Sequence, residues 1–314
     1  WRGSVVVGVE GFRLLPTFHP STAFKKWETS WFIRFDLARA ASPATYRPTP
    51  PPPPVTRCTT FQDVVDATAA EDGISSWLRT TRTAPPLAID IEGGVAGITA
   101  IALSQSGRTV SIGFCDLDGE PTMTEKDEVR VWAWLQMVLE SPVPKVLQNA
   151  AYDAFVLAWS YGIHLANIAE DTLFKMWEWK CELPKDLGTI TSVFTSLPYY
   201  KGERKAPTLD RFLTYNGMDA AITALAAERI PLTPDQDRDY RFRVRMIVPF
   251  LYMSLHGWHY DRTGARTAAA AVREKIAALQ AEINALAGVT VPTTLDGWVQ
   301  AARSTLCLAK PRRQ

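Results

Sequence analysis

The stretch LAIDIEGG, from Leu87 to Gly94, decides the fold class of this chain. It is an apolar run typical of a buried strand, yet it carries two carboxylates, Asp90 and Glu92. Side chains two residues apart on a strand point the same way and lie roughly 6.5 Å apart. An edge strand with solvated acids is one interpretation, but the apolar flanks favour a central strand. In a central strand the two acids are costly to desolvate unless a cation accompanies them.

The elements that follow this strand predict a mixed sheet. Two more strands, at 97–104 and 109–114, continue it as an antiparallel meander with Gly-containing turns. A helix with one apolar face follows at 125–139, and prolines come directly after it. A short strand then runs to Asn149, and further helices are predicted at 151–162, 171–179, 187–194 and 209–228. This order predicts an α/β fold in which helices flank a mixed sheet.

Composition and charge exclude several classes of protein. The 314 residues are 46% hydrophobic, enough for a large core, and no apolar run approaches the ~20 residues of a membrane span. Lys plus Arg number 34 against 33 Asp plus Glu, so nucleic-acid binding has to come from local patches or bound metal. The cysteines lack the spacing of a zinc ribbon or a disulfide framework, and stand at Cys58, Cys115, Cys181 and Cys307. We expect a cytoplasmic protein without a membrane partner, in the host-cell cytoplasm if its source is viral.

A proline run divides the chain. Residues 48–54 read PTPPPPP, which forms an extended polyproline spacer. We predict an N-terminal part, a Pro-rich linker, a compact α/β domain and an Ala-rich helical part, at 1–42, 43–57, 58–232 and 233–314. Because the sequence begins on Trp1 and goes straight into an apolar run, we expect a fragment of a longer polypeptide.

Two other segments of the α/β domain carry acids. Asn149 and Asp153 lie where a strand ends and a helix begins, so either residue could simply cap that helix. Tyr215 and Asp219 are four residues apart in a predicted helix and therefore lie on one face of it. Taken alone, each pair has an ordinary structural explanation.

Together with Asp90 and Glu92, these segments supply four carboxylates and a phenol. Four converging carboxylates resist joint ionisation, because each raises the pKa of the others. Two divalent cations would remove this repulsion, and oxygen ligands of this kind select Mg²⁺ or Mn²⁺ over zinc. Two such ions ~3.5 to 4 Å apart clamp the attacking and leaving oxygens of an in-line phosphoryl displacement. The acids therefore predict a metal-dependent phosphodiesterase.

The order IDIE, NAAYD and YNGMD resembles the three exonuclease motifs of the DEDD superfamily of 3′-to-5′ exonucleases. The Tyr-x3-Asp spacing of the third motif resembles the tyrosine subclass found in proofreading domains of family A DNA polymerases. The resemblance covers roughly 59–230, and the segment 170–201 resembles the corresponding stretch of phage polymerases. It implies an RNase H-like mixed sheet flanked by helices, with partial flanking domains.

The same resemblance implies roles for individual residues. The metal pair would be held by Asp90, Glu92, Asp153 and Asp219. Tyr215 would orient the attacking water through its hydroxyl, and Asn149 matches a family position that touches the terminal nucleotide. One departure is Gly93-Gly94, where relatives usually carry bulkier residues. It leaves the metal ligands unchanged but alters the expected shape of the terminal-nucleotide pocket.

Both flanks also resemble known families. The run around Thr17-Phe18-His19-Pro20-Ser21 is similar to the C-terminal part of uracil-DNA glycosylases, which implies a glycosylase remnant without activity. Residues 241–288 resemble the entry to a family A polymerase domain, although an ordinary Ala-rich helical hairpin explains their composition equally well. The catalytic motifs of a polymerase do not occur before Gln314, so we expect a polymerase domain in cis, downstream of this sequence.

The leading hypothesis is a two-metal 3′-to-5′ exonuclease that proofreads DNA, acting on the single-stranded 3′ end of a primer-template. One alternative is an inactive exonuclease-like module that binds DNA or serves as a scaffold. Another is an exoribonuclease of the same fold, which shares every motif. Lys201, Arg204 and Lys205 are candidates for phosphate contacts, although a solvated loop explains them as well.

Overall fold

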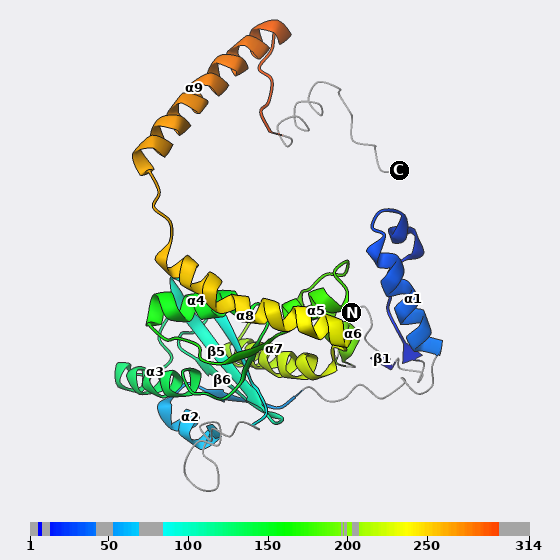
Figure 1. Cartoon of the computed structure of the whole chain (residues 1–314), viewed down its shortest axis with the longest axis vertical. Helices are drawn as coiled ribbons and strands as arrows, with labels where there is room; N and C mark the ends of the chain where they lie inside the picture. The colour runs from blue at the N-terminus through cyan, green and yellow to red at the C-terminus, as the bar shows by residue number, and fades with distance from the viewer. Residues whose placement is uncertain are drawn as a thin grey trace, which may run out of the picture. The chain divides into compact units, whose positions relative to one another are not determined.

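The computed structural model describes residues 6–7, 13–41, 53–68, 84–195, 197, 200–202 and 207–294 (Figure 1). The chain divides into two compact units, Trp1–His256 and Gly257–Gln314. The first unit contains the sheet and all of the predicted site residues, and the second contains one long helix.

A six-stranded mixed sheet forms the centre of the first unit (Figure 1). Its strand order is β3-β6-β5-β4-β7-β8. Strands β4, β5 and β6 form an antiparallel meander. The other pairs are parallel: β3 with β6, β4 with β7, and β7 with β8. The strands are β3 (Val55–Cys58), β4 (Leu87–Gly94), β5 (Gly97–Gln105), β6 (Arg108–Gly113), β7 (Lys145–Leu147) and β8 (Ile168–Asp171). The predicted RNase H-like α/β class, a mixed sheet flanked by helices, is confirmed.

Strand β4 is central, with β5 on one side and β7 on the other. Its first three residues, Leu87 to Ile89, are buried, as expected of a strand covered on both faces. Ala88 packs with Ala227 of α7 (Leu209–Arg229), while Ile89 belongs to the main core together with Leu157 of α4 (Ala150–Tyr161). The two helices therefore cover opposite faces of the sheet. The alternative of an edge strand with solvated acids is wrong.

Helix α7 runs across the sheet and contacts strands β3 to β7. Its close approach to β3 requires a glycine, because a Cβ atom at Gly217 would lie 2.4 Å from Cγ1 of Val55. Val55, Thr56 and Arg57, which the predicted linker includes, thus form an edge strand that packs under α7. The other helices of this part are α2 (Phe61–Thr68), α3 (Glu125–Leu139), α5 (Thr172–Trp179) and α6 (Leu187–Phe194).

One helix from each flank packs against the predicted α/β domain. In α1 (Glu28–Ala41), Phe32 joins a core cluster with residues of α5, α6 and α7, and the Arg39 guanidinium donates to the carbonyls of Ser192 and Thr195 at 2.8 Å each. Helix α8 (Pro234–His256) buries three residues, including Tyr240, in the main core. The glycosylase-like and polymerase-like assignments of these flanks stay predictions. Two short strands and a 3₁₀ turn precede α1, namely β1 (Val6–Val7), β2 (Arg13–Leu14) and η1 (Pro20–Phe24).

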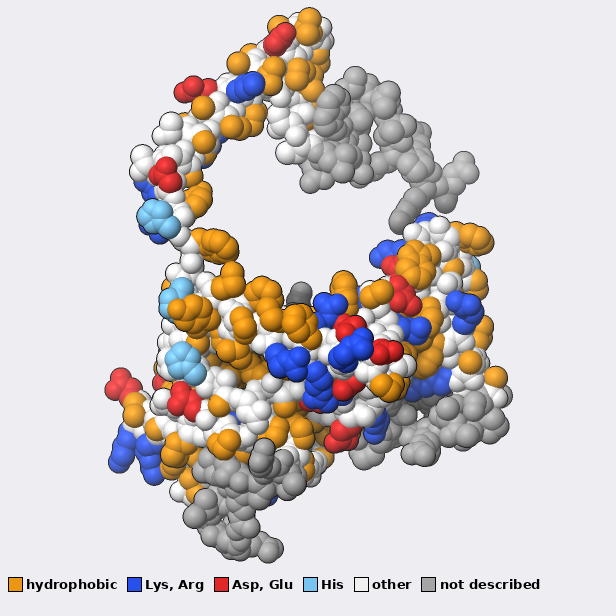
Figure 2. Space-filling model, in the orientation of Figure 1, with side chains coloured by type: hydrophobic (Ala, Val, Ile, Leu, Met, Phe, Trp, Pro, Cys, Tyr) orange, Lys and Arg blue, Asp and Glu red, His pale blue; other side chains and the backbone are white. Residues whose placement is uncertain are grey.

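Exposed apolar side chains mark the surface of α8 and the helix of the second unit. Figure 2 shows hydrophobic side chains gathered along α8, where Phe242, Phe250 and Tyr252 are exposed. In α9 (Arg262–Ala287) every residue is at least partly exposed. None of the described helices is both long and apolar enough to cross a membrane.

Candidate active site

Strand β4 and helix α7 bring three of the predicted acids together. Asp90 and Glu92 point to the same face of β4, the face that α7 covers, and Asp219 of α7 lies opposite them. One carboxylate oxygen from each of these three residues lies within 4.8 Å of the others. Asp219 is only 4% exposed. Residues more than 120 positions apart in the sequence thus form one acidic cluster.

Asp153 lies beside this cluster. It is in the first turn of α4, is 6% exposed, and its Oδ1 accepts a hydrogen bond of 3.3 Å from the backbone N–H of Ile91. Ile91 lies between Asp90 and Glu92. Asp153 of α4 therefore reaches the same part of β4 as Asp219 of α7. Burial raises the pKa of Asp153 to about 8. This carboxyl group is therefore held where ionisation is unfavourable without a cation.

The electrostatics of the cluster fit a divalent metal. Burial raises the pKa of Asp90 well above its usual range, and the three neighbouring carboxylates raise it further. A bound dication reverses this effect, because an opposite charge favours ionised carboxylates. The donors are carboxylate oxygens alone, which suit Mg²⁺ or Mn²⁺ better than zinc. The residues present therefore fit the predicted kind of metal.

Tyr215 lies one turn before Asp219 in α7 and is 4% exposed. Burial, and next the charge of Asp219, raise the pKa of its phenol. The hydroxyl therefore keeps its proton at neutral pH and can donate a hydrogen bond. It accepts one from the ammonium group of Lys201 at 3.2 Å.

Lys201 contacts the acids directly. Its Nζ donates to Oδ1 and Oδ2 of Asp219 at 2.7 and 2.6 Å. From its sequence, Lys201 is predicted to be a phosphate contact or part of a solvated loop, together with Arg204 and Lys205, which lie outside the described residues.

Asn149 occupies the N-cap position of α4, but its side chain makes no capping bond. Asp171 of β8 caps this helix instead, accepting from the backbone N–H groups of Asn149 and Ala150 at 3.3 and 2.8 Å. The same carboxylate also accepts from the N–H groups of Leu173 and Phe174, at the start of α5. The capping explanation for Asn149 is therefore wrong. Its side chain is exposed, and its contact with a terminal nucleotide stays a prediction.

The backbone conformation explains why residue 93 is a glycine. A β-bulge lies between Glu92 and Gly93, and Gly93 has a φ of +118°. A Cβ atom there would lie 2.4 Å from the carbonyl oxygen of Gly97. The carbonyl of Gly93 accepts a hydrogen bond of 2.9 Å from the hydroxyl of Tyr152 in α4. The glycine at this position thus follows from the tight turn between β4 and β5.

Sequence reasoning missed Asn216, which fixes the orientation of Asp90. Its Nδ2 donates to Oδ2 of Asp90 at 2.8 Å, and its Oδ1 accepts from the hydroxyl of Ser111 in β6 at 2.8 Å. Both Asn216 and Ser111 are fully buried. The carboxylate of Asp90 only accepts hydrogen bonds, so it faces the amide nitrogen, and the serine hydroxyl donates to the amide oxygen.

We expect Asn216→Ala to weaken Mn²⁺ binding by roughly 10-fold to 100-fold, the usual cost of losing a group that orients a metal ligand. Isothermal titration calorimetry measures the effect. Ser111→Ala should give a smaller loss, because the amide remains beside Asp90. An unchanged Mn²⁺ affinity in Asn216→Ala would show that Asp90 is positioned without it.

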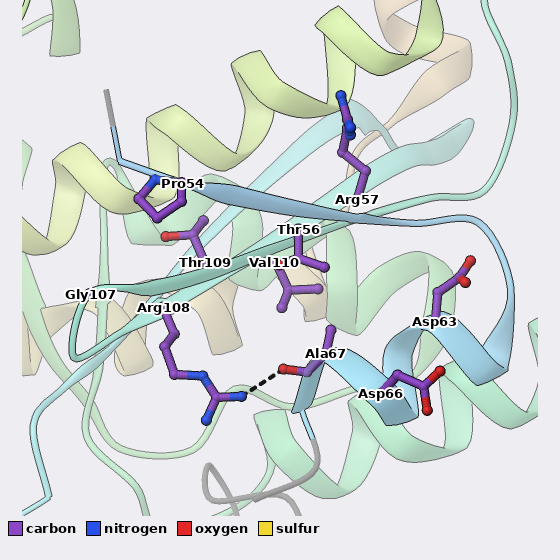
Figure 3. A pocket seen from close by; sticks show the side chains of 10 residues that line it. All are labelled: Pro54, Thr56, Arg57, Asp63, Asp66, Ala67, Gly107, Arg108, Thr109 and Val110. Carbon is purple, nitrogen blue, oxygen red and sulfur yellow. Dashed lines mark hydrogen bonds between the residues drawn. The ribbon is translucent and has the colours of Figure 1, made fainter. Parts of the chain in front are cut away.

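A pocket of about 490 Å³ lies apart from the acids (Figure 3). It is formed by β3, α2 and the start of β6, and in it Arg108 donates a hydrogen bond of 2.8 Å to the carbonyl of Ala67. Its lining carries two arginines and two aspartates, so it has no excess of either charge. None of the predicted site residues lines it.

No protein-family model and no curated protein matches this sequence. Solved structures do match. A structure described as the apo form of a nuclease is 17% identical, with 57% of this chain and 88% of that chain covered and a TM-score of 0.44. The POL domain of Pol1 from M. smegmatis, in complex with DNA primer-template and dNTP, is 14% identical, with 78% and 40% covered and a TM-score of 0.47. The catalytic core of RRP6 from Trypanosoma brucei is 15% identical, with 78% and 65% covered and a TM-score of 0.46. At these identities and TM-scores, the matches do not support a conclusion about function. The function has to be inferred from the side chains of this chain.

Proposed function

We propose that this chain is a divalent-metal-dependent 3′-to-5′ exonuclease that hydrolyses phosphodiester bonds at a single-stranded DNA 3′ end. One observation carries the proposal: carboxylates from β4, α4 and α7 meet at one place on the sheet, beside a buried tyrosine. A structural role alone gives no reason to bring four acids together, because their mutual repulsion destabilises the fold.

In this proposal Asp90, Glu92 and Asp219 hold the metal, with Asp153 beside them, and two ions of Mg²⁺ or Mn²⁺ bind in all. The bound ions would neutralise the charge of the phosphodiester and make a water more acidic. Tyr215 keeps its proton and orients that water by a hydrogen bond from its hydroxyl. Asp153 and Asp219 are buried, which strengthens the electrostatic interactions of their carboxylates.

We further propose proofreading DNA as the context, in a DNA polymerase I-like protein with its polymerase domain in cis downstream. The support is the resemblance of both flanks to enzymes that act on DNA. An exoribonuclease would use the same acids, so the substrate has to be tested directly. Matched DNA and RNA oligonucleotides distinguish the two enzymes by their relative rates.

A second candidate is an inactive module that binds DNA. One observation favours it: the ammonium of Lys201 already contacts both oxygens of Asp219. In such a module the lysine would replace the metal altogether. Calorimetry with Mg²⁺ and Mn²⁺ separates this candidate from the nuclease, since only the nuclease requires metal binding.

We expect the chain to release labelled mononucleotides from a 3′-labelled single strand in Mg²⁺, and to release none in excess EDTA. A 5′-labelled strand in parallel should shorten in steps, which distinguishes exonuclease from endonuclease activity. Release that continues in EDTA would contradict the proposed chemistry. An inert chain that also binds no metal would favour the inactive module.

A further inference from the structure

The contacts of Lys201 are unusual for a lysine in a loop. Its side chain is 22% exposed, and its ammonium lies between Asp219 and the hydroxyl of Tyr215. The rings of Tyr200 and Tyr215 lie 5.3 and 5.0 Å from Nζ. An exposed ion pair contributes little, whereas this pair is shielded from water by two aromatic rings.

The carboxylate of Asp219 accepts three hydrogen bonds, so most of its roughly four lone-pair sites are already occupied. Both of its oxygens accept from Lys201, and Oδ1 accepts in addition from the hydroxyl of Tyr200. The group is 4% exposed, so it cannot turn toward solvent to find another partner. A metal bound directly to Asp219 would therefore share this carboxylate with the ammonium of Lys201, and the two positive charges repel each other.

We propose that Lys201 is the resident cation of the acidic cluster, which holds Asp219 in the metal-free protein and competes with the divalent ion for it. The inference rests on the proposed function, because it assumes that the cluster binds metal. It adds a role for a residue outside the three sequence motifs. Lys201 compensates the negative charge of the acids before a metal binds. It also weakens metal binding, because the metal competes with the lysine for Asp219.

Two consequences can be measured without any assay of activity. Lys201→Met removes the competing cation, so the Kd of this variant for Mn²⁺ should be ~10-fold lower or more. A change of this size corresponds to the free energy of one charge-assisted hydrogen bond. The same variant leaves Asp219 uncompensated in EDTA. Its melting temperature should therefore drop in EDTA and rise more on adding saturating Mn²⁺ than that of the wild type.

Matched variants separate the competition from a general effect of charge. Lys201→Arg keeps a cation beside Asp219 and should bind Mn²⁺ with nearly wild-type affinity. Lys185→Met removes a lysine from the preceding loop, where Nζ contacts the carbonyl of Cys181 and not an acid of the cluster. It should leave the Mn²⁺ affinity unchanged. Lys201→Gln, which is neutral but can still donate to Asp219, replaces the methionine variant if that variant does not fold.

The experiment is calorimetric titration of Mn²⁺ into the wild type and these four variants, with thermal melting in EDTA and in Mn²⁺. Tighter binding in Lys201→Met or Lys201→Gln, together with unchanged binding in Lys185→Met, supports the inference. Equal or weaker binding than in a wild type that binds metal overturns it and leaves the proposed nuclease intact. A wild type that binds no metal, and releases no nucleotides, overturns the proposed function itself.

Discussion

Asp90→Asn is expected to lower the rate of nucleotide release at least ~10³-fold, since a metal site contributes several kcal/mol to the barrier. At the same time it should make the metal-free protein more stable. The two effects have one cause. Asp90 is half-buried beside three other acids; desolvation and these neighbouring charges raise its pKa, and an amide of the same shape removes both the charge and the repulsion. Asn216 can still donate to the new side chain.

Release of labelled mononucleotides measures the first effect, and urea unfolding in EDTA measures the second. Asp118→Asn is a suitable control, because Asp118 is an exposed acid in the turn after β6, outside the cluster. It should change neither quantity. If Asp90→Asn kept the wild-type rate, Asp90 would have no part in the reaction.

The metal-free protein should lose stability as the pH rises from about 4 to about 8. The pKa of Asp153 is raised to about 8 in the folded state, against ~3.9 in an unfolded chain. Between these values the folded state binds more protons than the unfolded state, so the free energy of unfolding falls with increasing pH. A shift of this size corresponds to several kcal/mol as an order of magnitude.

Urea unfolding in EDTA at pH 5 and pH 8 tests this dependence. The difference between the two pH values should shrink in Asp153→Asn, although the raised pKa of Asp90 leaves part of it. Saturating Mn²⁺ should also reduce the loss at pH 8, because a bound cation favours the ionised carboxylates. A free energy of unfolding that rises with pH in EDTA would contradict the prediction that the carboxyl group of Asp153 is buried in its protonated form.

Strong periodic patterns made the sheet predictable. The strands of the meander from β4 to β6 are apolar runs, helix α3 has an apolar face, and the structure has them close to the predicted residues. Strand β3 has no such pattern: it is four residues long, follows prolines, and exposes Thr56 and Arg57. Strand β8 is equally short and ends in two acids. Such strands are formed by pairing with neighbours, which a single sequence does not display.

The acids of the site were predictable because each lies in a short motif, and the order of the motifs is informative. The partners of these acids were not. Asn216 stands next to Tyr215 in the third motif, yet its bond to Asp90 depends on how α7 lies across β4. The contact of Lys201 with Asp219 depends on the path of a loop. Asp171 took the capping role expected of Asn149, because β8 brings its carboxylate to the start of α4.

The glycine contact between α7 and β3 has a practical consequence for anyone who wants to isolate the α/β domain. A shortened chain that begins at residue 58, the predicted start of the α/β domain, would lack Val55, the residue that fills the space beside Gly217. It would also leave the backbone of β6 unpaired along one side. Unpaired strands recruit other chains, so such a truncation invites aggregation, whereas a chain that starts before the last prolines retains its own protective strand.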